Sequence, residues 1–241
     1  MPTCLNCGTF ISDNFCPKCG QKKEVERLTW HSLVKETFHF FSHIEKGFLY
    51  TSYRLIIRPD KVIGEFLEGK RKKYFKPIAL YLIWVAIHLL AYQLITDLMH
   101  YENLRTRGET QAFIVKNSKL FGLLQLPIFS FFVWLIVSRP RLNFIETLVA
   151  LIYVFAAIEI LVFFQIIIVA LLFRTNFLTN AFLIQVQVVS SIWTFYCFIL
   201  FFRTKSIKLL VPRILLALVI ALWFNGEVTE LIAEMILKMK H

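Results

Sequence analysis

The sequence predicts an all-α, multi-span membrane helical bundle with a small four-cysteine zinc ribbon at its N-terminus. Of the 241 residues, 57% are hydrophobic and 18% are charged, whereas about a quarter of the residues of a soluble globular protein are charged. The apolar residues lie in runs of about 20, the length needed to cross the hydrocarbon core of a bilayer. We therefore expect four parts: a zinc ribbon (1–27), an amphipathic and polybasic collar (28–76), a five-span domain (77–224) and an amphipathic C-terminal helix (225–241).

The ribbon is predicted from four cysteines in the pattern C-x2-C-x8-C-x2-C: Cys4, Cys7, Cys16 and Cys19. A glycine follows each pair, and such short loops let backbone amides approach the thiolates of a tetrahedral structural Zn²⁺ site. The alternative, two disulfides or free thiols, needs an oxidising compartment, and no signal-peptide pattern precedes the first cysteine. We therefore expect structural zinc and a cytoplasmic N-terminus, with no open metal position for a catalytic water.

The partner of the ribbon is expected to be a protein. A ribbon of this size folds only with its metal, which favours a structural or adhesive role. The formal net charge of +11 would favour nucleic acid in a soluble protein. However, the ribbon lacks a dense basic stripe and aromatics arranged for base stacking, so nucleic-acid binding is the weaker alternative.

The first helix of the collar is expected to run from a cap at Thr29 to about Ile44, with one apolar and one polar side. On its polar side, Glu36, His39 and His43 share a spacing that could offer one carboxylate and two imidazoles to a metal. The alternative is a solvated face on which Glu36 pairs with a neighbouring cation, and we favour that interpretation.

Two shorter helices and a cationic turn complete the collar. Gly47 separates the first helix from a second over 48–57, and Pro59 begins a third that Gly69 ends. Five cations and two aromatics then precede the first span, and we expect the cations to contact anionic lipid headgroups. A specific phosphoinositide-like or nucleic-acid site is the sharper alternative. The five cations are Lys70, Arg71, Lys72, Lys73 and Lys76.

The two knuckles (4–8 and 15–21), residues 46–51 and residues 58–77 resemble a family of uncharacterised bacterial membrane proteins. That family is typical of Bacteroidota, carries a domain-of-unknown-function label and joins an N-terminal zinc ribbon to several transmembrane helices. The resemblance implies a location in the bacterial cytoplasmic (inner) membrane, assigns zinc to the four ribbon cysteines and supplies no catalytic residue. A looser similarity to Yip-type membrane proteins rests on the ribbon, the Arg58-Pro59 entry and the five-span count.

Five runs are expected to span the membrane: 77–99, 118–138, 144–172, 180–202 and 209–224. With the N-terminus inside and Arg213 assigned to a span, 19 Lys and Arg residues lie inside and 7 outside. This asymmetry supports the orientation, because positive charge favours the cytoplasmic side. The fifth run is the shortest, and the amphipathic residues after Gly226 are expected either to lie on the outer surface or to extend it.

Polar side chains within the spans indicate where chemistry could reside, because they are costly in hydrocarbon. His88 and Glu159 lie near the midpoints of the first and third spans, so packing could bring them to one level. They could form a proton or ligand site, or a single interhelical hydrogen bond that fixes packing, which we favour. Glu146 and Arg213 lie near the inner boundary, where we expect them to reach the interface.

Three classes of function follow. A non-catalytic scaffold or adaptor, with a ribbon that recruits a partner and a membrane anchor, uses every strong feature. A small transporter or permeation pathway would use His88 and Glu159, but no inverted repeat is present. A lipid-modifying enzyme would use the Glu36, His39 and His43 cluster, but none of the familiar hydrolase, metalloprotease or phosphate-loop motifs occurs, so we expect no enzyme activity.

Overall fold

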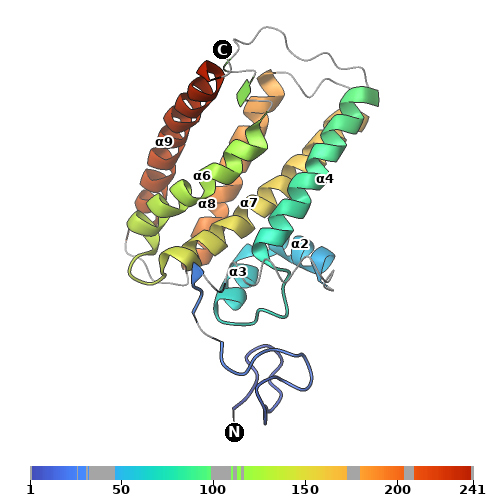
Figure 1. Ribbon diagram of the computed structural model, residues 1–241, viewed down its shortest axis with the longest axis vertical. Helices are drawn as coiled ribbons and strands as arrows, with labels where there is room; N and C mark the ends of the chain where they lie inside the picture. Colours follow the sequence, from blue (N-terminus) through green and yellow to red (C-terminus); the bar gives the residue numbers. More distant parts are fainter. Residues whose placement is uncertain are drawn as a thin grey trace.

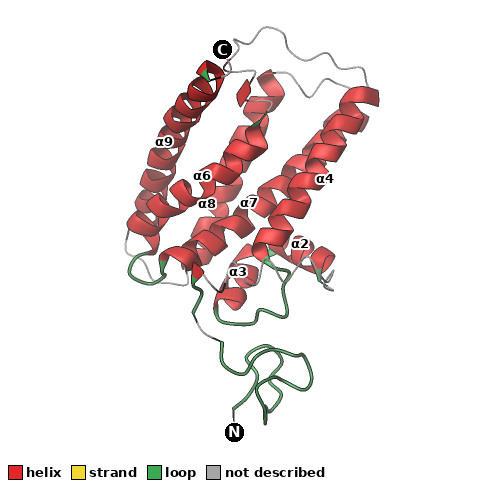
Figure 2. Cartoon of the chain, viewed as in Figure 1, coloured by secondary structure: helices red, strands yellow, loops and turns green. Residues whose placement is uncertain are grey.

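A computed structural model describes residues 2–25, 27–30, 32, 47–98, 110, 113–114, 117–172, 180–203 and 209–239. These residues form helices joined by turns, and in this part of the chain only isolated β-bridges occur, within the ribbon (Figure 2). The helices are α2 (Phe48–Ile57), α3 (Pro59–Leu67), α4 (Pro77–Leu98), α6 (Ser118–Val133) continued by the π-helical η2 (Trp134–Ser138), α7 (Phe144–Ile167) continued by the π-helical η3 (Ile168–Leu172), α8 (Asn180–Arg203) and α9 (Leu210–Lys238).

Five helices of the described chain are long and apolar enough to cross a membrane, which confirms the membrane helical class. They coincide closely with the five predicted runs, except at the end of the chain. There, α9 continues without interruption through Gly226 to Lys238, so the C-terminal segment extends the fifth helix. One glycine inside a helix costs only about 1 kcal/mol, which the contacts of α9 with α6 and α8 offset.

Helix α7 is the centre of the bundle. It contacts α4, α6, α8, α2 and α3, and 50% of its apolar window is buried, the largest share among the five spans. A helix that is apolar on all sides can bury every side, and the Ile-, Val-, Leu- and Ala-rich sequence of α7 has this character. Helices α6 and α8 pack beside it, α9 packs against α6 and α8, and Figure 1 shows α4 and α9 on opposite flanks.

The collar helices α2 and α3 pack under the bundle rather than standing apart from it (Figure 1). Leu55, Val62, Ile63 and Phe66 are at most 1% exposed, so the apolar faces of both helices belong to the main core. Pro59 occupies the first turn of α3, as predicted. The ribbon lies below the collar, and the C-terminus lies at the opposite end of the bundle, as an odd number of spans requires (Figure 1).

Most of the predicted first collar helix, including Glu36, His39 and His43, lies outside the described residues. Its start is described. The backbone N–H of Ser32 donates to Oγ1 of Thr29 at 3.3 Å, the contact that a capping threonine makes with the third residue after it.

Candidate functional site

The ribbon consists of two knuckles with the same backbone geometry. In the first, the N–H of Gly8 donates to the carbonyl of Cys4; in the second, the N–H of Gly20 donates to the carbonyl of Cys16, at 2.8 and 2.9 Å. Both glycines have positive φ, 74° and 70°, a conformation that glycine adopts without steric cost. An antiparallel bridge closes each knuckle, Thr3 with Phe10 and Phe15 with Lys22. The two C-x2-C turns therefore face each other.

The four sulfur atoms fit a single tetrahedral ion. All four lie within 4.8 Å of one another, and Cys4–Cys19 and Cys7–Cys16 Sγ distances are 3.6 and 3.5 Å. Bonds of about 2.3 Å to a tetrahedral Zn²⁺ place the sulfurs about 3.8 Å apart. The cysteines are free thiols, since a disulfide needs about 2.05 Å between sulfurs. The cluster can hold a metal ion, and four thiolates are one of the ligand sets of structural zinc.

The surroundings of the thiols differ in their effect on deprotonation. Hydrogen bonds with the side chain and backbone of Thr9 lower the pKa of Cys7 to about 6. Burial raises the pKa of Cys19 to about 11. Because metals bind the thiolate, the sulfur of Cys7 is more readily available than that of Cys19 at neutral pH.

Gln21 fixes the ribbon to the cationic turn of the collar. Its side chain is buried; Nε2 donates to the carbonyl of Gly69 at 2.8 Å, and Oε1 accepts from the N–H of Lys72 at 3.4 Å. A Cβ at Gly69 would lie 3.1 Å from Leu5 and 3.2 Å from Val25. Glycine at this position therefore allows the ribbon to approach the turn closely.

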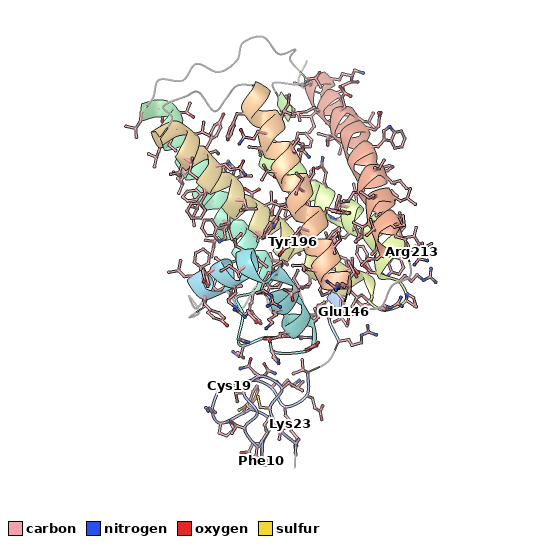
Figure 3. The ribbon with its side chains drawn as sticks, turned by 180° about the vertical axis from the view of Figure 1, so that it is seen from behind. Phe10, Cys19, Lys23, Glu146, Tyr196 and Arg213 are labelled. Carbon is pink, nitrogen blue, oxygen red and sulfur yellow. The ribbon has the colours of Figure 1, made fainter. Side chains whose placement is uncertain are left out.

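Arg27 fixes the end of the ribbon to the central helix. Its guanidinium makes two hydrogen bonds to the carboxylate of Glu146, at 2.8 and 2.7 Å, and this pairing raises the pKa of Arg27. Glu146 also accepts from the N–H of Asn143, whose own side chain accepts from the N–H of Glu146, forming a capping box at the start of α7. Figure 3 shows Glu146 at the base of the bundle, at the end of the helices that faces the ribbon.

The expectation that Glu146 reaches toward the interface is therefore wrong. The residue is 6% exposed, and the guanidinium of Arg27 together with the N–H of Asn143 compensates its carboxylate for the loss of water. Arg213 lies at the ribbon end of α9, at the predicted inner boundary (Figure 3).

The carboxylate of Glu65 in α3 partly neutralises the charge of the cationic turn. Nζ of Lys73 lies 2.6 Å and Nζ of Lys70 3.5 Å from the carboxylate of Glu65, and Tyr74 donates to it at 2.8 Å. Burial of Glu65 by itself raises the pKa, but these hydrogen bonds and charges outweigh it and hold the pKa at about 2. Lys72 is exposed, whereas Arg71 and Lys76 are half-buried. Headgroup contact by these five cations stays a prediction, with Lys72 the most accessible of them.

The turn is also tied to the bundle by its backbone. The N–H of Phe75 donates to Oγ1 of Thr51 at 2.9 Å, and its carbonyl accepts from the hydroxyl of Tyr153 at 2.6 Å. Nε1 of Trp84 donates to Oγ of Ser52 at 2.9 Å. All these groups are buried, so α2, α4 and α7 are joined by satisfied polar contacts inside an apolar core.

His88 and Glu159 meet between α4 and α7. Nδ1 of His88 lies 2.7 Å from Oε2 of Glu159, and both side chains are less than a tenth exposed. An apolar cavity of about 10 Å³ lies elsewhere, between α3, α6, α7 and α8, and neither residue lines it. The contact is the interhelical bond that the sequence favoured, and whether it also has a function stays a prediction.

Three residues of these sites were missed by sequence reasoning: Gln21, Arg27 and Glu65. The partners of Gln21 and Arg27 are distant in sequence, so no local spacing identifies them. The partners of Glu65 are near in sequence but lie beyond the end of α3, where helical spacing no longer applies. The capping box of Asn143 and Glu146 was missed as well, although a local signal could have found it: the pattern N-x-x-E before an apolar run marks the start of a helix.

The fold and the cysteine cluster define an integral membrane protein with five candidate spans and a metal-competent ribbon docked on one end. A family model described as "Protein of unknown function (DUF3667)" matches residues 45–89. The matched segment comprises α2, α3, the cationic turn and the half of α4 that ends just after His88. No curated protein and no solved structure matches the chain. The match bears on neither the Bacteroidota distribution nor the Yip-type similarity.

Proposed function

We propose that this protein is a non-catalytic membrane scaffold or adaptor whose zinc ribbon recruits a protein partner on the cytoplasmic side of a bacterial inner membrane. One observation carries the proposal. The ribbon exposes 65% of Phe10 and 61% of Phe15, although it buries Gln21 against the collar. Figure 3 shows Phe10 at the end of the ribbon farthest from the helices and Cys19 on the near side.

This arrangement suits recruitment. Exposed aromatics are the side chains that most often anchor protein interfaces, because they bury a large area with little loss of rotamer freedom. The contacts of Gln21 with the collar and of Arg27 with α7 hold the ribbon in place, so a partner bound at the aromatic end gains a defined position relative to the membrane. The metal would hold the two knuckles that carry Phe10 and Phe15.

Site-specific photocrosslinking tests the proposal. A photoreactive residue at Asp13, an exposed position between the two aromatics, is expected to give a discrete protein adduct in cells. Phe10→Ser combined with Phe15→Ser should abolish that adduct while the zinc content of the purified protein stays unchanged. Lys18→Ser, an exposed change on the second knuckle, is the matched control and should retain it. An adduct that survives loss of both aromatics, or no protein adduct at all, contradicts recruitment at this surface.

A second candidate, a proton-linked permeation pathway, is favoured by the direct contact of His88 with Glu159. Two ionisable groups that share a hydrogen bond near the middle of a membrane are a common element of proton relays. Proteoliposomes with an internal pH dye test it. Proton flux that disappears with Glu159→Gln would support the pathway, and equal flux in empty and loaded vesicles would exclude it.

A further inference from the structure

Helix α8 carries exposed polar side chains that the described part of the chain leaves uncovered. Only 22% of its apolar window is buried, the smallest share among the five candidate spans. Figure 3 views the molecule from the side of α8 and shows this helix, with Tyr196, in front of the bundle. Its inner side contacts α3, α7 and α9, and none of the described helices covers its outer side, which can therefore face lipid or another protein.

Amide side chains on this outer side lack adequate partners. Gln185 and Gln187 are both exposed. Gln187 makes one long, exposed hydrogen bond, from Nε2 to Oγ of Ser191 at 3.5 Å, and Gln185 makes none among the described residues. Each amide has two donors and an acceptor oxygen, so most of this capacity is unused.

The depth of these residues makes the deficit costly. Helix α8 has 24 residues, which at about 1.5 Å per residue exceed the roughly 30 Å of hydrocarbon by little. Gln187 and Ser191 therefore lie about 10 and 16 Å from the outer end of the helix, within the hydrocarbon, where lipid chains offer no hydrogen bonds.

We infer that a second copy of this chain covers the outer side of α8, and that the two copies form a parallel dimer. Amides are self-complementary, because each side chain both donates and accepts, so two α8 helices related by a two-fold axis can exchange hydrogen bonds between Gln185, Gln187 and Ser191. Exposed Ile184, Val188 and Ile192 recur every fourth residue beside them and supply the packing surface. Ser191 is small enough for close approach of the helices, as is typical of membrane helix pairs.

The oligomeric state of the full-length protein in lipid nanodiscs tests the inference. The parent protein is expected to have twice the monomer mass. Gln185→Leu combined with Gln187→Leu should raise the dissociation constant of the dimer by about tenfold, because interhelical hydrogen bonds are lost. These leucines are compatible with lipid and should leave the fold intact, which unchanged zinc content and helicity verify. Gln93→Leu removes an exposed amide from α4 and, as the matched control, should leave the dimer unchanged.

Crosslinking in native membranes tests whether the dimer interface lies on α8. Ile192→Cys in a Cys197→Ser background is expected to form a covalent dimer with a short bismaleimide, whereas Leu90→Cys, exposed on α4, should add nothing to the parent pattern. A monomeric parent overturns the inference. So does a dimer that is insensitive to both glutamine changes, or one that crosslinks through Leu90→Cys.

Discussion

Glu146 shows how one side chain at the start of the central helix serves two structures. It completes the capping box of α7 with Asn143, and it binds the guanidinium of Arg27 at the end of the ribbon. The arginine side chain is 67% exposed and the glutamate side chain 7%. Without the arginine, the carboxylate of Glu146 still caps the N-terminus of α7, where negative charge is favourable. Without the glutamate, both the ion pair and the cap are lost.

The two substitutions should therefore differ in cost. Arg27→Ala should lower the free energy of unfolding by about 0.5–1 kcal/mol, as expected for a largely exposed ion pair. Glu146→Ala should lower the free energy of unfolding by about 1 kcal/mol more than Arg27→Ala does, because the cap is lost as well. Thermal or denaturant unfolding in detergent measures both. Equal losses would show that the capping box contributes nothing to stability.

Glu65 should make the stability of the collar depend on pH. Its pKa is about 2 in the folded protein, against 4.5 for an unperturbed glutamate. A depressed pKa contributes stability that is fully present above about pH 4.5 and is lost as the pH falls toward 2. We expect Glu65→Gln to destabilise the protein at pH 7 by on the order of 1–2 kcal/mol after solvent screening. The difference between the variant and the parent should shrink between pH 4.5 and 3. A difference that is constant over this range would disprove the role of the Glu65 charge.

The cysteine cluster should hold one zinc ion per chain. Cys16→Ser combined with Cys19→Ser leaves two sulfurs, which cannot complete a tetrahedral site, so zinc measured by elemental analysis of purified protein should fall to background. Cys197→Ser is the matched control, because this cysteine is buried in α8 away from the ribbon. Unchanged zinc in the double variant would refute the ligand set.

At the scale of elements, the features that could be predicted are those encoded locally. Hydropathy over about 20 residues gives the spans, Pro59 gives the start of α3, and the C-x2-C spacing gives the knuckles. The contacts that assemble these elements could not be predicted. Gln21 binds a carbonyl 48 residues away and Arg27 a carboxylate 119 residues away, and only the folded chain brings such groups together. For the residues after Gly226 the sequence left two alternatives, and the continuous helix α9 agrees with the one in which they extend the fifth span.

The junction between ribbon and collar should fail when Gly69 gains a side chain. Gly69 has a φ of 105°, and its added Cβ would press on Leu5 and Val25. We expect Gly69→Ala to cost about 1–2 kcal/mol and to detach the ribbon, seen as faster amide exchange in residues 65–76. Gly64→Ala is the matched control, since Gly64 lies inside α3 with open space around it, and this change should be neutral or slightly stabilising. Equal exchange in the parent and in Gly69→Ala would show that the close approach is unimportant.

At the scale of the whole molecule, polar contacts join the ribbon, the collar and the bundle into a single assembly at one end. Gln21 joins the ribbon to the collar, Phe75 joins the cationic turn of the collar to α2 and α7, and Glu146 joins the ribbon to α7. The cationic turn lies at the same end. The ribbon and the collar therefore lie on the same side of the membrane.

We expect the ribbon and the collar to lie inside and the C-terminus outside. Five crossings put the two ends of the chain on opposite sides, and the excess of Lys and Arg at the ribbon end favours the cytoplasm for it. In spheroplasts, a membrane-impermeant maleimide should label Met239→Cys directly, at a position that is 84% exposed. It should label Lys72→Cys above the parent level only after the membrane is disrupted. Labelling of both from outside would mean an even number of crossings, and the reverse pattern would mean that charge does not set the orientation of this protein.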